Sequence, residues 1–342
     1  MNKKRWLALG LAVLILIVSF AVPKYNPVTE DNAQAISKML PFQMMGGMGG
    51  ITESELEPGD KSGRIVHLTL KGTIADTSSN LSGTGYNHDF LLSQLELIKE
   101  DPTVKAILFE VDTPGGGAYE SAEILDQIKQ IQEARQIPVY VTMQSMATSG
   151  GYYVSASADK IYASPETWTG SIGVIMQMYN FTGLFEKYGI SVNTLKSGAN
   201  KDIGSSSRPM TEEEKALLQE LIDDAYQRFV GVVAEGRDMD EAIVRKLADG
   251  RIYTANQALE NGLVDGIMYQ DKVLERLRAD HGLENAQVFQ YQLNNPFSLY
   301  SSMLSLKSFL VGQKDPARAE LEQLLSGESL QAPRLMYLYG GE

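Results

Sequence analysis

Residues 106–117 read Ala-Ile-Leu-Phe-Glu-Val-Asp-Thr-Pro-Gly-Gly-Gly, and the fold class follows from this stretch. A mostly apolar run of six residues is typical of a strand that is buried on both faces of a sheet. The proline and the three glycines end that strand in a tight connection. A helical pattern follows from Ala118 to about Ala134. The order strand, glycine turn, helix favours an α/β fold with largely parallel pairing.

The same alternation extends to both sides of this stretch. Short helices are predicted at 90–98 and 150–158, and a long one should begin at a capping box formed by Thr211 and Glu214 and run to about Gly236. Shorter helices should follow near 239–248, 255–261 and 270–280, so the second half is largely helical. Strands are predicted at 65–70, 139–143, 160–163, 172–178 and 191–195.

The N-terminus predicts a membrane anchor. Residues 1–5 carry a basic cluster that should stay cytoplasmic, and residues 6–22 form an uncharged apolar run at the short end for spanning a bilayer. The alternative is a cleaved secretory signal, because Ser19-Phe20-Ala21 offers a small-x-small site. Either interpretation exports the rest of the chain. With the anchor uncleaved, the protein is a single-pass cell-membrane protein whose folded domain is extracytoplasmic.

The remaining chain divides into three segments. Residues 23–61 are broken by prolines and contain a low-complexity Met/Gly stretch, which indicates a flexible stalk. Residues 62–292 carry the strand and helix patterns and should form the globular domain. Residues 293–342 form a C-terminal extension that ends in an isolated apolar segment, 335–339.

Composition excludes several kinds of function. The formal net charge is −13, without a basic stripe, so nucleic acid is not an expected partner. The chain has no cysteine, which excludes disulfides, thiolate metal sites and a cysteine nucleophile. The three histidines, His67, His88 and His281, are far apart and lack metal-ligand spacing. We therefore expect no metal site.

Two segments could carry chemistry. The glycines at 115–117 follow a buried strand and leave backbone N–H groups uncovered, as an oxyanion hole requires; the alternative is a plain tight turn. Ser149 ends another predicted strand and precedes a small-residue helix, the position of either a nucleophile or an N-cap serine. Ser145 is also available. Asp112 fits a turn residue, and Trp168, Tyr152 and Tyr153 fit packing roles.

A serine nucleophile here needs an unusual base. No histidine lies between His88 and His281, and His67 falls in the middle of a predicted strand. A lysine can take the role if its neutral amine is available. Lys196 and Lys201 flank a short loop, and for either lysine the alternative is a solvated surface charge.

Seven motifs in this order resemble the signal peptide peptidase A (protease IV) family over about residues 62–290. They are Asp112-Thr-Pro-Gly-Gly-Gly117, Met146-Ala-Thr-Ser-Gly-Gly-Tyr-Tyr153, Thr169-Gly-Ser-Ile-Gly-Val174, Lys196-Ser-Gly-Ala-Asn-Lys-Asp-Ile-Gly204, Ser207-Arg-Pro-Met-Thr211, Asp249-Gly-Arg-Ile-Tyr253 and Gly262-Leu-Val-Asp-Gly266. Each motif is weak alone, but the ordered set is specific. The length matches the short form of the family, with one catalytic repeat.

The resemblance implies a crotonase-like (Clp-peptidase-like) fold, in which ββα units wind into a superhelix. It implies a serine endopeptidase that degrades remnant signal peptides at the membrane, without metal or cofactor. Ser149 resembles the nucleophile, Lys201 the general base and Ser171 the hydroxyl that orients the lysine. Gly116 resembles one oxyanion-hole donor, with a second amide near Ser149 and Gly150. A ring-like homo-oligomer with sites built between subunits is also implied.

Departures and rival interpretations accompany this resemblance. Thr148 stands where alanine is usual, and Ser206 where the lysine loop usually has proline. A crotonase-type acyl-CoA enzyme would share the glycine turn but would leave Lys201 unused, and a non-catalytic membrane scaffold could keep the fold. The apolar tail at 335–339 is similar to a signal-peptide remnant, so it could lie as an added strand in the substrate groove and inhibit. The alternatives are docking to the domain surface and simple disorder.

Overall fold

The computed structural model describes residues 50–76, 86–293 and 335–338. The predicted basic segment at 1–5 and anchor at 6–22 lie outside the described residues, as do most of the stalk and most of the C-terminal extension. Among the described residues, no helix has the length and apolar character needed to cross a membrane.

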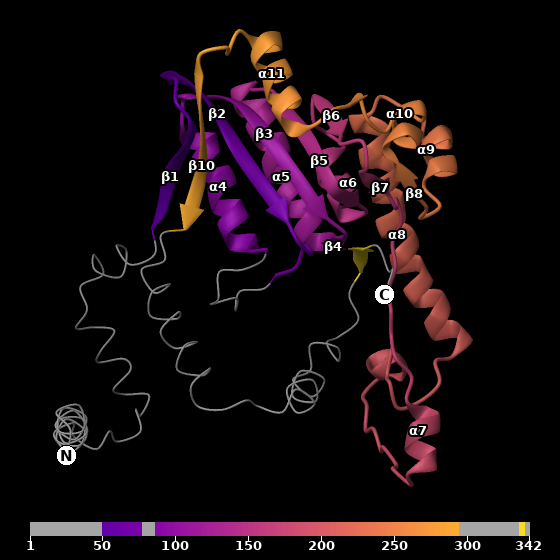
Figure 1. Ribbon diagram of the computed structural model, residues 1–342. Helices are drawn as coiled ribbons and strands as arrows, with labels where there is room; N and C mark the ends of the chain where they lie inside the picture. Colours follow the sequence, from indigo (N-terminus) through magenta and orange to yellow (C-terminus); the bar gives the residue numbers. More distant parts are fainter. Residues whose placement is uncertain (1–49, 77–85, 294–334, 339–342) are drawn as a thin grey trace, which may run out of the picture. The chain divides into compact units, whose positions relative to one another are not determined.

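One nine-stranded sheet organises the described chain (Figure 1). Neighbours from β10 to β9 pair in parallel, β1 pairs antiparallel with β10, and β7 (Trp168–Gly170) leaves β5 to pair antiparallel with β8 (Ile252–Thr254). This mostly parallel sheet confirms the α/β class. The main path runs through β1 (Ile51–Glu57), β10 (Ala286–Leu293), β2 (Asp60–Lys71), β3 (Val104–Thr113), β5 (Val139–Thr148), β6 (Lys160–Ala163) and β9 (Gly266–Ile267).

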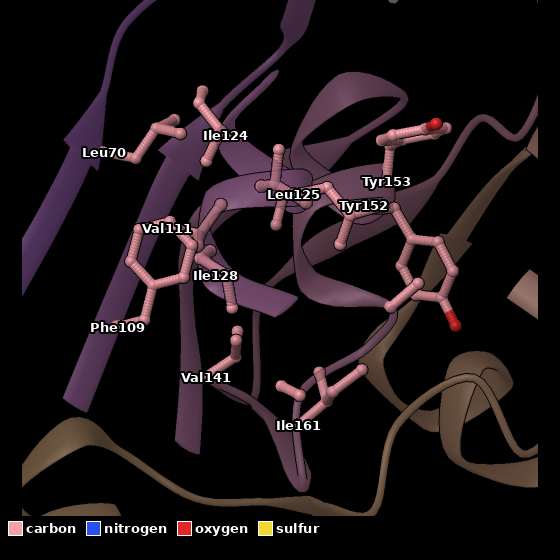
Figure 2. Close-up of a cluster of buried hydrophobic side chains, with 14 of the residues drawn as sticks. Leu70, Phe109, Val111, Ile124, Leu125, Ile128, Val141, Tyr152, Tyr153 and Ile161 are labelled. Atoms are coloured by element: carbon pink, nitrogen blue, oxygen red, sulfur yellow. The ribbon is translucent and has the colours of Figure 1, made fainter. Parts of the chain in front are cut away.

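The central strand β3 contributes side chains to two hydrophobic cores, one on each face of the sheet. Its residues Phe109 and Val111 pack with the apolar faces of α4 (His88–Glu100) and α5 (Ala118–Arg135), the core drawn in Figure 2. Leu108 points to the other face and packs with α11 (Gln270–His281). Successive strand residues face opposite sides of a sheet, so a strand that is apolar in both registers needs cover on both faces.

The second half is helical, as expected. It contains α8 (Glu212–Gly236), α9 (Glu241–Leu247) and α10 (Ala255–Glu260). The predicted capping box is present, because the Thr211 hydroxyl accepts from the Glu214 N–H at 3.1 Å and the Thr211 N–H donates to the Glu214 carboxylate at 2.9 Å. Apart from Glu214, the buried residues of α8 lie in its C-terminal half.

Three sequence-based assignments differ from the structure. The strands predicted at 172–178 and 191–195 are wrong: Ile175 makes only an isolated bridge with Met336, and 191–195 is exposed and irregular. A strand is stable only when it pairs with another strand, and the local sequence does not show whether such a partner is present. The sheet also begins earlier than residue 62, because β1 and the start of β2 fall within the predicted stalk.

Two glycines in α8 predict opposite changes in stability. A Cβ on Gly236 would lie 2.1 Å from the Ala156 carbonyl oxygen, whereas one on Gly231 would meet nothing within 4 Å. Gly236→Ala should therefore lower the free energy of unfolding by about 1–3 kcal/mol through overpacking. Gly231→Ala should raise the free energy of unfolding by about 0.5–1 kcal/mol, because alanine loses less backbone entropy than glycine when the helix forms. Denaturant unfolding of both variants checks this pair; equal effects would show that the Gly236–Ala156 contact does not limit the packing.

Candidate active site

Ser149 lies on a strained turn between β5 and α6 (Gly150–Ser155). Its φ is 54° and its ψ −113°, a positive-φ conformation outside the left-handed helical region that costs a non-glycine residue free energy. The turn is held by the Ser149 N–H, which donates to the Gly170 carbonyl at 2.7 Å, and by the Tyr153 N–H, which donates to the Ser149 carbonyl at 2.9 Å. A strained serine between a strand and a helix is the geometry of a nucleophile elbow.

The Ser149 hydroxyl has no hydrogen-bond partner among the described residues. The residue is 1% exposed and occupies the N-cap position of α6, but its Oγ makes no capping bond to the helix, so capping does not account for the serine. Leaving a buried hydroxyl unpaired costs about 1–3 kcal/mol. This group is thus held away from water, in a strained conformation, with its hydrogen-bonding capacity unused.

The glycines beside Ser149 permit close packing of α6. A Cβ on Gly150 would lie 2.6 Å from the Ser121 hydroxyl, and one on Gly151 would lie 2.6 Å from the Thr113 methyl. Any larger residue would push α6 off β3 and α5. The two glycines therefore bring the Ser149 turn against the glycine segment that follows β3.

That glycine segment forms a short strand, β4 (Gly115–Gly117), and not only a turn. On one side the Gly117 N–H donates to the Ile74 carbonyl at 2.8 Å, and a Cβ on Gly116 would lie 1.8 Å from the same oxygen. Only glycine fits at residue 116. α5 begins directly afterwards at Ala118, so β4 presents its other edge for pairing.

The C-terminal tail occupies that edge. Its strand β11 (Met336–Leu338) pairs antiparallel with β4, with Tyr337 opposite Gly116. On the tail's other side, Met336 and Ile175 exchange two backbone hydrogen bonds, each 3.1 Å. The Tyr337 carbonyl oxygen lies 3.1 Å from where a Cβ on Gly150 would stand. An extended peptide is thus held by main-chain bonds, with a carbonyl beside both predicted oxyanion donors.

An aromatic pocket receives the Tyr337 side chain. Its ring stacks on Tyr153 at 4.8 Å between centroids, lies 4.8 Å from Phe229, and its hydroxyl donates to the Ala225 carbonyl at 3.0 Å. Burial raises the pKa of Tyr337 above its ordinary value. Sequence reasoning assigned Tyr153 to packing and missed this pocket, since its members lie far apart in the chain.

Ser171 lies next to the Ser149 turn. Thr148 pairs with Gly170 in the β5–β7 ladder, so Ser171 directly follows the residue that receives the Ser149 N–H. Ser171 is buried, has a positive φ of 49°, and donates its N–H to the Arg251 carbonyl at 2.8 Å. It also lines a cavity of about 580 Å³ that reaches Leu338 of the tail. The tertiary structure therefore gathers Ser149, Gly150, Gly116 and Ser171.

Lys201 is not part of this cluster within the single chain. It lies on a 3₁₀ turn, Ala199–Asp202, its side chain is exposed, and it makes no hydrogen bond to the Ser149 hydroxyl. Lys196 differs, because its ammonium donates to the Ala199 carbonyl at 2.7 Å and to the Asp202 carboxylate at 2.6 Å. Its nitrogen is engaged inside its own loop, which favours Lys201 as the lysine available to an outside partner.

The other candidate groups have structural partners. His67 contacts Glu110 and the Gln270 side chain, and neither it nor any other described residue bonds to the Ser149 hydroxyl. Asp112 accepts from the Ser145 hydroxyl at 2.6 Å and the Met146 N–H at 3.3 Å, which ties β3 to β5. Trp168 is 49% exposed, so its predicted packing role holds only in part. In the described part of the chain, no cluster of three acidic or histidine side chains could hold a metal.

Comparison with known proteins assigns the family. Residues 131–284 match peptidase family S49. The chain is 43% identical, over the full length of both proteins, to a candidate signal peptide peptidase SppA of Enterococcus faecium. It is 37% identical to a candidate protease of Synechocystis, covering 68% of this chain and 80% of that protein. It is 30% identical to Protease 4 of Haemophilus influenzae, covering 79% of this chain and 43% of that longer protein. These matches agree with the strained serine turn that lies beside the strand paired with the tail. The chain belongs to the signal peptide peptidase A group of peptidase family S49 and is a serine protease acting on peptides.

Proposed function

We propose that this chain is a membrane-anchored serine endopeptidase that degrades remnant signal peptides, with Ser149 as nucleophile and Lys201 as general base. The observation that carries this proposal is the buried, unpartnered Ser149 hydroxyl on a strained turn, next to a strand that already pairs with a peptide segment. A signal-peptide remnant is an apolar extended segment, as the bound tail is.

The chemistry is acyl transfer. The neutral Lys201 amine takes the proton of Ser149 as Oγ bonds to the substrate carbonyl carbon, and the backbone N–H groups of Gly116 and Gly150 hold the oxyanion. The C–N bond then breaks, the amine product leaves with the proton, and water hydrolyses the acyl-enzyme. Each oxyanion donor should contribute on the order of 3 kcal/mol to transition-state stabilisation. The Ser171 hydroxyl orients the lysine.

The lysine that reaches each serine comes from a second copy of the chain. None of the residues 173–213 is buried, and Lys201 lies among them. Large apolar side chains that gather on an exposed surface mark an interaction site. Covering it with a neighbouring subunit in a ring-like homo-oligomer would also carry Lys201 to a Ser149 that lacks a partner. The large exposed apolar residues of this region and the first turns of α8 are Ile175, Tyr179, Leu184, Tyr188, Ile190, Val192, Leu195, Leu217 and Leu221.

The same proposal includes the chain's organisation. Residues 6–22 anchor the protein in the cell membrane, the basic residues at 1–5 stay cytoplasmic, and a stalk carries the peptidase domain on the extracytoplasmic side. The strands β2, β3, β5 and β6, separated by α4, α5 and α6, are compatible with crotonase-like ββα units wound as a superhelix.

The pH dependence of turnover tests the general base. Only a neutral lysine can accept the serine proton, so kcat/KM for a quenched apolar peptide should rise with pH. The measurement uses the full chain in detergent between pH 5 and 10. A profile that is flat across this range would contradict a lysine base.

Removing the tail should activate the enzyme. The tail occupies the peptide-binding edge of β4. Because the tail belongs to the same chain, its effective concentration at that edge is high, on the order of mM. Deleting residues 332–342 should therefore raise kcat/KM by about tenfold. Tyr337→Ala in the full-length chain should give part of this gain, because it empties only the aromatic pocket. Unchanged or lower activity of the deletion variant would remove the inhibitory role.

A further inference from the structure

The turn that carries Lys201 has little internal support. It is a four-residue 3₁₀ turn closed by the Lys201 N–H to the Gly198 carbonyl and the Ile203 N–H to the Asn200 carbonyl, both 3.2 Å. The ten residues before it are all exposed. Loops of this kind are mobile unless other groups fix them, and a base displaced by 1 Å can lose about 10²-fold in rate.

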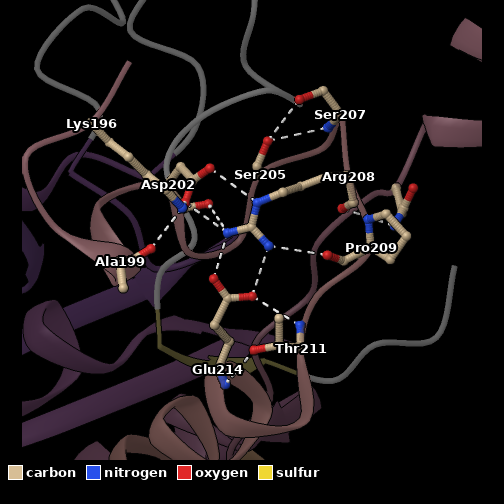
Figure 3. A network of polar contacts seen from close by, with 10 residues as sticks. Lys196, Ala199, Asp202, Ser205, Ser207, Arg208, Pro209, Thr211 and Glu214 are labelled. Carbon is tan, nitrogen blue, oxygen red and sulfur yellow. Dashed lines mark hydrogen bonds and ion pairs between the residues drawn. The ribbon is translucent and has the colours of Figure 1, made fainter. Parts of the chain in front are cut away.

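A single guanidinium supplies the missing support. Arg208 holds the Asp202 carboxylate through Nε at 3.0 Å and Nη2 at 2.7 Å, and it holds the Glu214 carboxylate through Nη1 at 2.9 Å and a further Nη2 bond (Figure 3). Asp202 directly follows Lys201 and also accepts the Lys196 ammonium. The planar five-donor fork of arginine can serve two carboxylates at once, which a lysine cannot do.

The other end of the network is firmly anchored. The Glu214 side chain is only 4% exposed and closes the capping box at the start of α8. The same helix enters the core through Phe229 and Val233 and supplies the Ala225 carbonyl that binds Tyr337. Arg208 therefore links the Lys201 turn to the helix that lines the peptide-binding site. Lys201 itself makes no side-chain hydrogen bond or ion pair within the described residues, so the network holds its backbone and leaves its amine available.

We propose that Arg208, through Asp202 and Glu214, is the positioning residue for the Lys201 general base. This inference rests on the proposed Ser–Lys function and adds a group that touches neither substrate nor serine. It also explains why the two candidate lysines differ. The Lys196 ammonium is bound to Asp202 and helps to hold the turn, whereas the Lys201 amine is left unbound by the network.

The charges of the network persist through the working pH range. Hydrogen bonds from Arg208, then Lys196, hold the pKa of Asp202 well below its usual range, and Arg208 with the Thr211 N–H lowers the pKa of Glu214 to about 2. A carboxyl with a lowered native pKa stabilises the fold above its unfolded pKa, 3.8 for Asp and 4.5 for Glu, and loses that contribution as pH falls toward the native value. Between pH 5 and 10 both groups stay ionised, so they cannot produce a rise in turnover across that range.

The experiment compares Arg208→Ala, Arg208→Lys and Lys201→Ala in the full chain in detergent. Arg245→Ala is the matched control, because Arg245 makes an exposed ion pair with Glu241 one turn away on α9. For Arg208→Ala we expect kcat to fall about 10- to 100-fold while KM changes less than about threefold. The rate at which a fluorophosphonate labels Ser149 should fall with kcat. Arg208→Lys should recover part of both losses, and Arg245→Ala should match the unchanged protein.

The outcomes separate this inference from the function on which it rests. Wild-type kcat in Arg208→Ala, beside an inactive Lys201→Ala, would overturn the positioning role and leave the Ser–Lys function standing. Full activity in Lys201→Ala would overturn the function itself. If Arg208→Ala fails to fold or assemble, as judged by size-exclusion chromatography, the kcat values of Arg208→Lys and Asp202→Asn are compared instead. Wild-type kcat in both, or a loss that appears only with altered assembly, would reduce Arg208 to a structural ion pair.

Discussion

Replacing Ser149 with alanine is expected to lower turnover of an apolar peptide by at least about 10⁴-fold, because the acyl-enzyme cannot form without the hydroxyl. The fold should survive, since the hydroxyl has no hydrogen-bond partner in the described chain and its removal leaves no group unpaired. Alanine tolerates the positive φ about as poorly as serine, so stability should change little. Initial rates with a quenched peptide, together with thermal unfolding, measure both effects.

Ser145→Ala is the matched control for this substitution. Ser145 lies four residues earlier, is the other serine of the same segment, and donates its hydroxyl to Asp112. It should keep most of the activity. Turnover that survives Ser149→Ala would place the nucleophile elsewhere. A chain that is correctly folded yet inert toward every peptide before any substitution would favour the non-catalytic scaffold.

Lys201→Ala is expected to cause a loss of similar size, because without a base the serine remains a weak nucleophile at neutral pH. Lys246, an exposed lysine of α9 outside the proposed subunit interface, provides the control, and its alanine variant should retain activity. If turnover persists in Lys201→Ala, the base is misassigned and Lys196 is the next candidate, despite its contacts with Ala199 and Asp202.

Mixing the two inactive variants tests whether the site is shared between subunits. A Ser149→Ala subunit still carries Lys201, and a Lys201→Ala subunit still carries Ser149. If the lysine acts on a neighbouring subunit, equal and random mixing in a ring should restore about a quarter of the sites. If each chain supplied its own lysine, mixing would restore nothing. The second result would leave the dyad intact but remove the shared site.

Local sequence predicted the elements whose formation depends on near neighbours. The capping box at Thr211 and Glu214 is correct because both partners lie within one helical turn. The predicted strand at β3 and the predicted helix at α5 are correct because their signals are local. Apolar residues in succession indicate a strand buried on both faces, and helical periodicity indicates a helix. The strands predicted at 172–178 and 191–195 failed because a strand depends on a partner that is distant in the chain.

The sequence by itself indicated the α/β class, the family, the strands and helices whose pattern is local, and Ser149, Lys201, Ser171, Gly116 and Gly150 as candidate site residues. Only the tertiary structure decided that Ser149 is strained and unpartnered, that the tail lies along β4, and that Arg208 supports the Lys201 turn. The physical reason is that burial, main-chain pairing and ion pairing depend on which distant segments meet. Side-chain chemistry is encoded residue by residue, but its geometry is set by the packing of the whole domain.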